Sequence, residues 1–196
     1  TIGSGPTVED GTVRTAARRA WRRYLEGEGL LAGVALALER PVSKGPISRK
    51  ARTVVIGSGR TFARAAAREA EGLGFRALER PDTLRGEARA CGPRLVARFE
   101  GLRGEAPTCF IATGETVVKV RGRGRGGRNQ ELALSSIEAL ARCSRPTVLA
   151  AFATDGVDGI SEAGGALVDD RSARRAVARG VSMRDALERN DSFEAL

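Results

Sequence analysis

The chain has 196 residues, 41% of them hydrophobic, and a formal net charge of +9. A chain of this length buries roughly 70% of its unfolded surface, so its composition argues against intrinsic disorder. No apolar run approaches the about 20 residues that a membrane-spanning helix needs, which predicts a protein without a membrane anchor. Histidine is absent, which excludes Ser-His-Asp triads and imidazole metal ligands.

The first 50 residues carry turn and helix signals but no strand signal. A turn at Gly3–Thr7 precedes an expected helix over Thr12–Glu26, an apolar stretch at Leu30–Leu38 and a polar connector at Pro41–Lys50. We place a domain boundary near Ala51 and expect the first segment, 1–50, to be the end of another domain. A chain that begins at Thr1 rather than Met is consistent with a piece of a longer protein.

Strand-like and helix-like segments alternate through the second predicted domain, 51–196. Strands are expected at Thr53–Gly57, Phe75–Leu78, Thr108–Ala112, Thr116–Val120 and Thr147–Ala153, the third and fourth flanking a Thr-Gly-Glu turn. Helices are expected at Thr61–Leu73, Glu87–Phe99, Asn129–Arg142, Ser172–Arg179 and Ser182–Arg189. This alternation indicates an α/β fold with a parallel or mixed sheet flanked by helices.

The cysteines and arginines indicate the redox state of the thiols and the kind of ligand that the chain could bind. Cys91, Cys109 and Cys143 are widely spaced and form no CxxC motif, so we expect reduced thiols in a cytoplasmic protein. Of the 33 basic residues, 30 are arginine. Arginine suits bidentate binding of phosphate and carboxylate, although GC-rich codon usage produces the same bias.

The most informative stretch runs from Val120 to Glu131 and reads VRGRGRGGRNQE. Glycines allow close backbone approach, so successive N–H groups and the following helix N-terminus can converge on an anion. Arg128 occupies the position of a P-loop lysine, but the GK[ST] ending is absent. Two other interpretations stay open: a solvated basic loop, and an RGG-like segment that binds nucleic acid.

A second candidate segment, Thr154–Gly159, follows an apolar strand. Asp155 and Asp158 are suited to hold Mg²⁺ or to orient a substrate hydroxyl; alternatively the segment is an acidic turn that caps the next element. By contrast, Gly57-Ser58-Gly59 lacks the third glycine of a dinucleotide fingerprint, because position 62 is Phe62. We therefore interpret it as a tight strand-to-helix turn.

An ordered series of motifs resembles the glycerate 2-kinase family, also called class II glycerate kinases or the MOFRL family. The matching segments are Ser4–Thr7 (SGPT), Thr53–Ser58 (TVVIGS), Gly114–Thr116 (GET), Arg121–Glu131 (RGRGRGGRNQE), Thr154–Gly159 (TDGVDG) and Asn190–Ser192 (NDS). Arg123 replaces a lysine of the family pattern, Thr113 replaces the first glycine of GGET, and Ala153 stands where glycine usually precedes TDG.

The resemblance implies a Rossmann-like first domain joined to a smaller α/β domain, with the active site between them. It implies transfer of the γ-phosphoryl group of ATP to D-glycerate, with Mg²⁺, although some members carry the name hydroxypyruvate reductase. Carried over by motif, Arg128 and Asp155 are expected to be catalytic, and Asp155 with Asp158 to hold Mg²⁺. The expected substrate- and phosphate-binding residues are Ser4, Gly5, Glu115, Arg121, Gly122, Gly124, Gly126, Gly127, Asn129, Gln130, Glu131, Thr154, Gly156 and Asn190.

The family's upstream half and its last segment have no counterpart in this sequence. We therefore expect the 196 residues alone to fold but to be inactive, and an exposed sheet edge to favour self-association. The partners implied are ATP and glycerate, with no membrane. A nucleic-acid partner is the less favoured alternative, because aromatic residues are scarce near the arginine-rich stretch.

Overall fold

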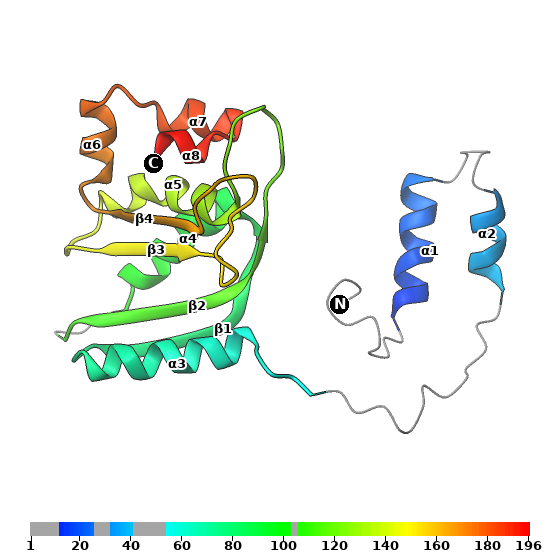
Figure 1. The fold of residues 1–196 in the computed structure, drawn as a ribbon, viewed down its shortest axis with the longest axis horizontal. Helices are drawn as coiled ribbons and strands as arrows, with labels where there is room; N and C mark the ends of the chain where they lie inside the picture. Colours follow the sequence, from blue (N-terminus) through cyan, green and yellow to red (C-terminus); the bar gives the residue numbers. More distant parts are fainter. Residues whose placement is uncertain (1–11, 26–31, 41–53, 103–105) are drawn as a thin grey trace. The chain divides into compact units, whose positions relative to one another are not determined.

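The computed structural model describes residues 12–25, 32–40, 54–102 and 106–196 (Figure 1). The chain divides into two compact units, Thr1–Ile56 and Gly57–Leu196. The boundary expected between 50 and 51, the turn at Gly3–Thr7 and the connector at Pro41–Lys50 lie outside the described residues.

The first unit contains helices α1 (Val13–Tyr24) and α2 (Ala32–Glu39), and α1 confirms the helix predicted over Thr12–Glu26. Arg14 and Arg18 of α1 both donate to the carbonyl oxygen of Leu38, with N–O distances of 2.9 and 3.1 Å for the Arg14 Nη2 and Arg18 Nε atoms. These guanidinium groups supply donors to carbonyls at the end of α2 that have no partner within the helix.

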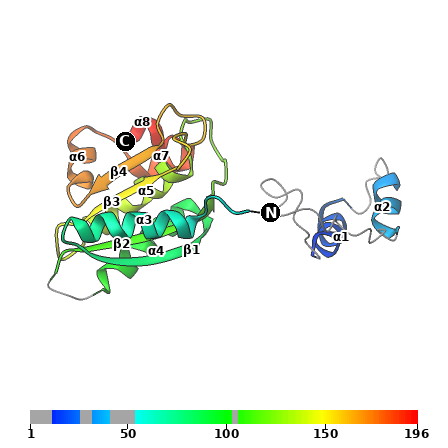
Figure 2. The same cartoon turned by 60° about the horizontal axis from the view of Figure 1, so that its bottom comes forward.

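The second unit contains two separate two-stranded sheets (Figures 1 and 2). Strand β1 (Arg76–Glu87) pairs in parallel with β2 (Thr108–Val117), and β3 (Val148–Phe152) pairs in the antiparallel direction with β4 (Gly165–Asp169). Helix α3 (Gly59–Gly72) contacts both strands of the first sheet, and α4 (Ala88–Glu100) connects them. The α/β class with parallel pairing is therefore confirmed.

The strand predicted at Thr53–Gly57 is wrong for its described part. Residues 54–57 pair with no described strand, and Ile56 is 95% exposed. Ser58 instead caps α3, because its Oγ accepts from the backbone N–H of Thr61 at 3.1 Å. An apolar β-branched run forms a strand only where a neighbouring strand supplies hydrogen bonds.

The turn predicted at Thr113–Glu115 is also wrong, since β2 runs through it without a break. Gly114 has a φ of 152°, and a Cβ there would lie 2.3 Å from the carbonyl oxygen of Leu84. It faces the irregular register of β1 between Arg80 and Leu84. Gly114 therefore allows the backbones of β1 and β2 to approach closely and does not reverse the chain.

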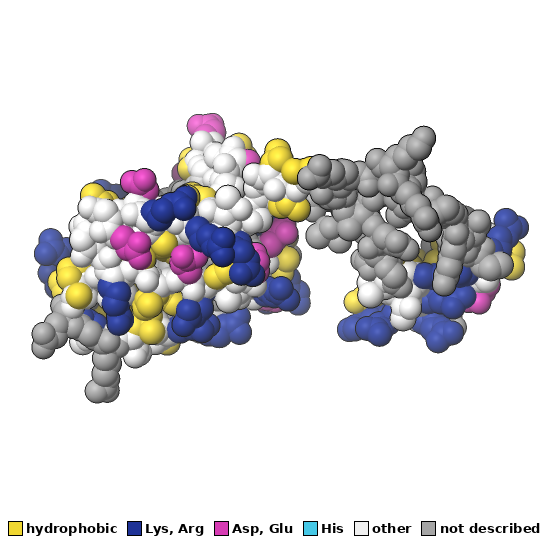
Figure 3. Space-filling model, turned by 90° about the horizontal axis from the view of Figure 1, so that it is seen from below, with side chains coloured by type: hydrophobic (Ala, Val, Ile, Leu, Met, Phe, Trp, Pro, Cys, Tyr) yellow, Lys and Arg dark blue, Asp and Glu magenta, His cyan; other side chains and the backbone are white. Residues whose placement is uncertain are grey.

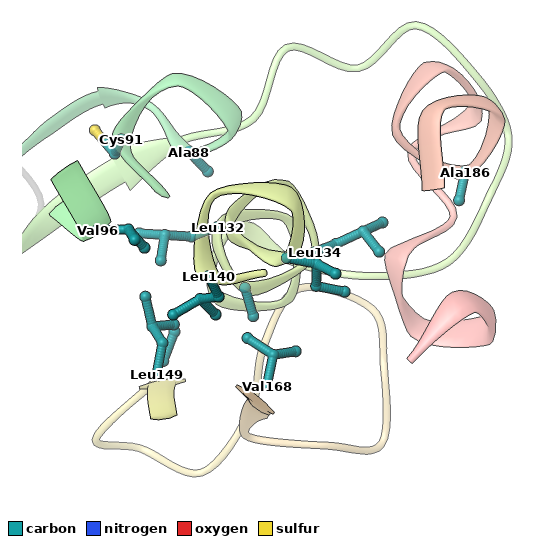
Figure 4. Packing of buried hydrophobic residues seen from close by; sticks show 12 residues of the cluster. Ala88, Cys91, Val96, Leu132, Leu134, Leu140, Leu149, Val168 and Ala186 are labelled. Carbon is teal, nitrogen blue, oxygen red and sulfur yellow. The ribbon is translucent and has the colours of Figure 1, made fainter. Parts of the chain in front are cut away.

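The largest core surrounds helix α5 (Arg128–Leu140), as Figure 4 shows. Leu132 lies beside Val96 of α4, and Leu140 faces Leu149 of β3. Full burial of each such leucine contributes about 1.5–3 kcal/mol. Three short helices lie on the side of α5 away from β3: α6 (Ser172–Ala178), α7 (Met183–Arg189) and α8 (Ser192–Ala195). Helices α3 to α7 match their predicted positions, whereas β4 and α8 were not predicted.

Among the described residues, no helix combines the length and the hydrophobicity that crossing a bilayer requires.

Candidate functional site

Residues 121–127, here called the strap, connect β2 to α5 without regular secondary structure. Exposure alternates along it: Arg121, Arg123 and Arg125 are exposed, whereas Gly122 and Gly124 between them are half-buried. The strap therefore has a glycine side that faces the protein and an arginine side that faces solvent.

The glycine side packs against the segment that joins α7 to α8. A Cβ at Gly122 would lie 2.3 Å from the carbonyl oxygen of Arg189, and one at Gly124 would lie 2.4 Å from the Cβ of Asp191. Contacts this short leave no room for any side chain. The glycine repeat is thus required by close packing within the protein itself.

Five of the seven backbone N–H groups of the strap donate to groups of the protein itself. Asn190 Oδ1 accepts from the N–H of Arg121 at 2.6 Å and of Gly122 at 2.9 Å. The N–H groups of Gly124, Arg125 and Gly127 donate to the Arg189 carbonyl, to Asp191 Oδ1 and to Gln130 Oε1. The arginine side chains are therefore the main donors that this surface offers to an anion.

Asp158 caps the N-terminus of α5. Its Oδ1 accepts from the backbone N–H of Asn129 at 3.0 Å, its Oδ2 accepts from that of Gln130 at 2.7 Å, and the residue is 1% exposed. Both oxygens therefore neutralise the positive end of α5. Of the two carboxylates predicted to hold Mg²⁺, only Asp155 is exposed.

A buried ion pair between Arg89 and Glu131 lies next to the strap. The Glu131 side chain is 2% exposed and is bound by Arg89, with both N–O distances 3.1 Å. Asn190 Nδ2 donates to Glu131 Oε2 at 3.0 Å and to the Lys119 carbonyl at 3.3 Å. A carboxylate at this depth is tolerated because it is paired and hydrogen-bonded. Asn190 thus links this pair to the backbone of the strap.

Arg128 lies at the first residue of α5 and donates from Nη1 to Glu115 Oε1 of β2 at 2.7 Å. Both side chains are exposed, at 45% and 76%. Arg125 contacts Glu194 at 3.4 Å and lies over the Phe193 ring at 4.8 Å. Arg121 and Arg123 form no ion pair within the described part of the chain.

The fold thus brings together most of the residues predicted for the site. Glu115, the strap, residues 128–131, Asp158 and Asn190 form one contiguous region. Thr154, Asp155 and Gly156 lie on the exposed loop between β3 and β4, which touches the strap where Gly159 approaches the Gly126 carbonyl. Ser4 and Gly5 lie outside the described residues.

Sequence reasoning missed Arg89, whose partner Glu131 lies 42 residues away. No local pattern distinguishes it from the many exposed arginines. The cysteines stay apart from the site: all three are free, and burial raises the pKa of the Cys109 and Cys143 thiols. Within the described ranges, no three His, Cys, Asp or Glu side chains gather in a way that would hold a metal.

Comparison with known proteins identifies the family of the C-terminal part of the second unit. Residues 108–196 match the MOFRL family. The whole chain is 33% identical to a glycerate 2-kinase of Pyrococcus horikoshii and covers 47% of that protein. A 90-residue part is 46% identical to a D-glycerate 2-kinase of Thermotoga maritima, covering 46% of this chain and 21% of the relative.

A crystal structure of a Thermotoga maritima glycerate kinase superposes with a TM-score of 0.68 at 35% identity, covering 74% of this chain and 36% of that one. The chain spans less than half the length of each of these relatives. Residues 108–196 are therefore a MOFRL family domain in a homologue of the glycerate 2-kinases.

Proposed function

We propose that this MOFRL-domain chain provides part of an ATP-dependent glycerate 2-kinase. The reaction would transfer the γ-phosphoryl group of ATP to the 2-hydroxyl of D-glycerate and give 2-phosphoglycerate. The similarity to glycerate 2-kinases over the whole chain supports the substrates. Segment 1–50 would belong to another domain of the kinase, and 51–196 would be the MOFRL-like domain.

The observation that carries the proposal is the arginine side of the strap next to Arg128. Phosphoryl transfer depends on positioning and on neutralising phosphate charge more than on covalent chemistry by the protein. Arg121 and Arg123 are exposed and without an ion-pair partner among the described residues, so binding a phosphate breaks no existing ion pair. Guanidinium groups also bind phosphate oxygens bidentately.

Arg128 is our candidate for stabilising the phosphoryl group during transfer. The α5 N-terminus fixes its backbone, while among the described residues its side chain pairs only with exposed Glu115. An exposed ion pair contributes about 0–1 kcal/mol, so an anionic substrate displaces Glu115 at little cost. Asn129, Gln130, Glu131 and Asn190 support this arrangement through buried contacts.

Asp155 fits as a Mg²⁺ ligand and Asp158 does not. Mg²⁺ in phosphotransferases is held by one or two carboxylates together with water and substrate phosphates. Asp155 is exposed and accepts only a 3.3 Å hydrogen bond from the Val157 N–H, whereas both Asp158 oxygens are bound by α5. When bound, Mg²⁺ would neutralise charge on the ATP phosphates. We place the reaction in the cytoplasm, where free thiols stay reduced.

A coupled assay of ADP release with D-glycerate tests the proposal. It should be run on the 196-residue chain and on the longest natural protein that contains it. We expect turnover by the longer protein and little or none by the 196 residues. Glycerate-independent oxidation of NADH with hydroxypyruvate would favour a reductase instead, and no turnover of glycerate or of related hydroxy acids would refute the kinase.

A further inference from the structure

Helix α1 carries an arginine face that the proposed kinase reaction does not use. The helix contains Arg14, Arg18, Arg19, Arg22 and Arg23 among its 12 residues and no acidic residue. In Figure 3, Lys and Arg side chains account for much of the visible described surface of this unit. Five like charges on about 18 Å of helix repel one another and lower helix stability, so the face calls for a functional explanation.

Within the described residues, two of the five arginines bind α2 and the other three do not. Arg14 and Arg18 bind carbonyls at the end of α2, and Arg18 also pairs with Glu39 at 3.1 Å. Arg19, Arg22 and Arg23 are exposed and form no ion pair with any described residue. Together with Thr15 and Arg18 they lie next to one another on one face of α1.

We propose that this arginine face of α1 is a binding surface for the phosphate backbone of single-stranded nucleic acid. The exposed guanidinium groups can make fork-shaped contact with phosphate oxygens. Tyr24 is 69% exposed beside them, with the Arg23 guanidinium 5.3 Å from its ring centroid. An exposed aromatic ring next to cationic groups is the combination on which unpaired bases stack.

An anionic membrane surface fits these observations less well. Interfacial helices insert large apolar side chains into the bilayer opposite their basic face. The side chain of Trp21 lines the cleft that α1 forms with α2, together with Leu36 and Leu38. The remaining exposed apolar positions on α1 are mostly alanine and valine, which offer little area for insertion.

Fluorescence anisotropy with a labelled oligouridylate tests the proposal on the full 196-residue chain. Each phosphate neutralised on a single strand lowers the logarithm of affinity by about 0.7 per tenfold increase in salt. Three arginine contacts therefore predict a slope of about −2, or about a 20-fold loss of affinity between 50 and 200 mM salt. The variant Arg19→Gln/Arg22→Gln/Arg23→Gln should lose this salt dependence.

The matched control removes the same charge from another helix. Arg60, Arg64 and Arg68 are exposed on α3 and form no ion pair among the described residues. The variant Arg60→Gln/Arg64→Gln/Arg68→Gln should keep the wild-type slope. Tyr24→Ala should weaken binding about fivefold or more without changing the slope, since stacking is not ionic.

Equal losses from the α1 and α3 variants would mean attraction by net charge alone and would overturn the proposal. So would the absence of salt-sensitive binding to the oligonucleotide. Binding to vesicles that contain anionic lipid, or to an acidic peptide, in preference to the oligouridylate would assign the surface to those partners instead. Far-UV circular dichroism of each variant checks that its total helix content matches that of the wild type.

Discussion

Arg128 and Glu115 form a 2.7 Å ion pair in which both partners stay exposed. One residue begins α5 and the other lies near the end of β2, so the pair joins the two elements that the strap connects. The Glu115 carboxylate accepts from the Arg128 guanidinium, which we propose to bind the transferred phosphoryl group. Under the proposed function, Glu115 would compete with the anionic substrate for Arg128.

Glu115→Gln should strengthen anion binding, because it removes the competing charge while keeping the side-chain size. The gain is limited to about fivefold by the small contribution of an exposed ion pair. Isothermal titration with ATP measures the dissociation constant, and Glu162→Gln is the control, since Glu162 faces Arg125 at 3.7 Å instead. Unchanged or weaker binding in Glu115→Gln would show that Glu115 is a ligand contact rather than a competitor.

Arg128→Ala in the active protein should lower kcat by about 10³-fold, as removal of an arginine finger does, which equals about 4 kcal/mol of barrier. Arg60→Ala on α3 provides the comparison, and its cost should be far smaller because Arg60 is an exposed arginine outside the candidate site. Arg128→Lys should restore activity only in part, since a point charge lacks the planar fork. Equal, mild losses at both positions would remove Arg128 from the catalytic residues.

Gly124→Ala should destabilise the second unit by about 1–3 kcal/mol, the usual cost of overpacking. The new methyl group would lie 2.4 Å from the Cβ of Asp191. Gly72→Ala is the matched control: nothing lies within 4 Å of a Cβ there, so it should be neutral or stabilising by up to about 1 kcal/mol. Urea denaturation monitored by circular dichroism measures both. Equal stability of the two variants would show that the strap is not tightly packed.

The helices of the second unit were predictable because amphipathic periodicity is local. α3, α4 and α5 lie within a few residues of their expected bounds. The strand predicted at Thr53–Gly57 failed for the opposite reason, since a strand exists only through a partner that the local sequence does not name. The turn predicted at Thr113–Glu115 failed because Gly114 meets Leu84, 30 residues earlier in the chain.

The strap likewise depends on long-range contacts that the local sequence does not reveal. Its position between a strand and a helix was predictable, and so was the gathering of glycine and arginine. A glycine repeat indicates that the backbone packs closely against a neighbouring group. The motif does not indicate whether that group is a bound ligand or another segment of the chain. Here it is residues 189–192, more than 60 residues away. Asp158 likewise carries the signature of a metal ligand and serves as a helix cap.

Asp169 makes stability depend on pH in the acidic range. Hydrogen bonds from Arg175 and from the Ser172 hydroxyl lower the pKa of its carboxyl from 3.8 to about 2. A lowered pKa stabilises the folded state above pH 3.8, and this contribution is lost as the pH falls from there towards 2. Asp169→Asn should therefore be less stable than wild type at pH 5, and the difference should shrink on acidification to pH 3.

Urea midpoints at several pH values measure that difference. Arg184→Gln serves as the control, since its only described pair, with Glu188, is long at 4.0 Å and highly exposed. A gap between Asp169→Asn and wild type that stays constant from pH 5 to pH 3 would contradict the assignment.

Asn190 is the residue on which the strap depends most. It is 8% exposed, adopts the left-handed conformation with φ 55°, and uses its side-chain amide for four hydrogen bonds. Asn190→Gly keeps that backbone conformation available and removes the amide, so it should cost about 1–3 kcal/mol for donors and acceptors left unsatisfied. Asn190→Asp should cost more at neutral pH, because it places a second carboxylate against Glu131 where the amide now donates at 3.0 Å.

The two variants separate side-chain bonding from backbone strain. If strain relief dominated, Asn190→Gly would equal or exceed the wild type in urea denaturation, which would refute a stabilising role for the Asn190 amide. If the amide holds the strap, Asn190→Asp should regain stability relative to Asn190→Gly as the pH is lowered, because protonating one of two facing carboxyl groups removes their repulsion. Hydrogen exchange at the Arg121 and Gly122 amides, which donate to Asn190, should accelerate in Asn190→Gly more than exchange in the middle of α5.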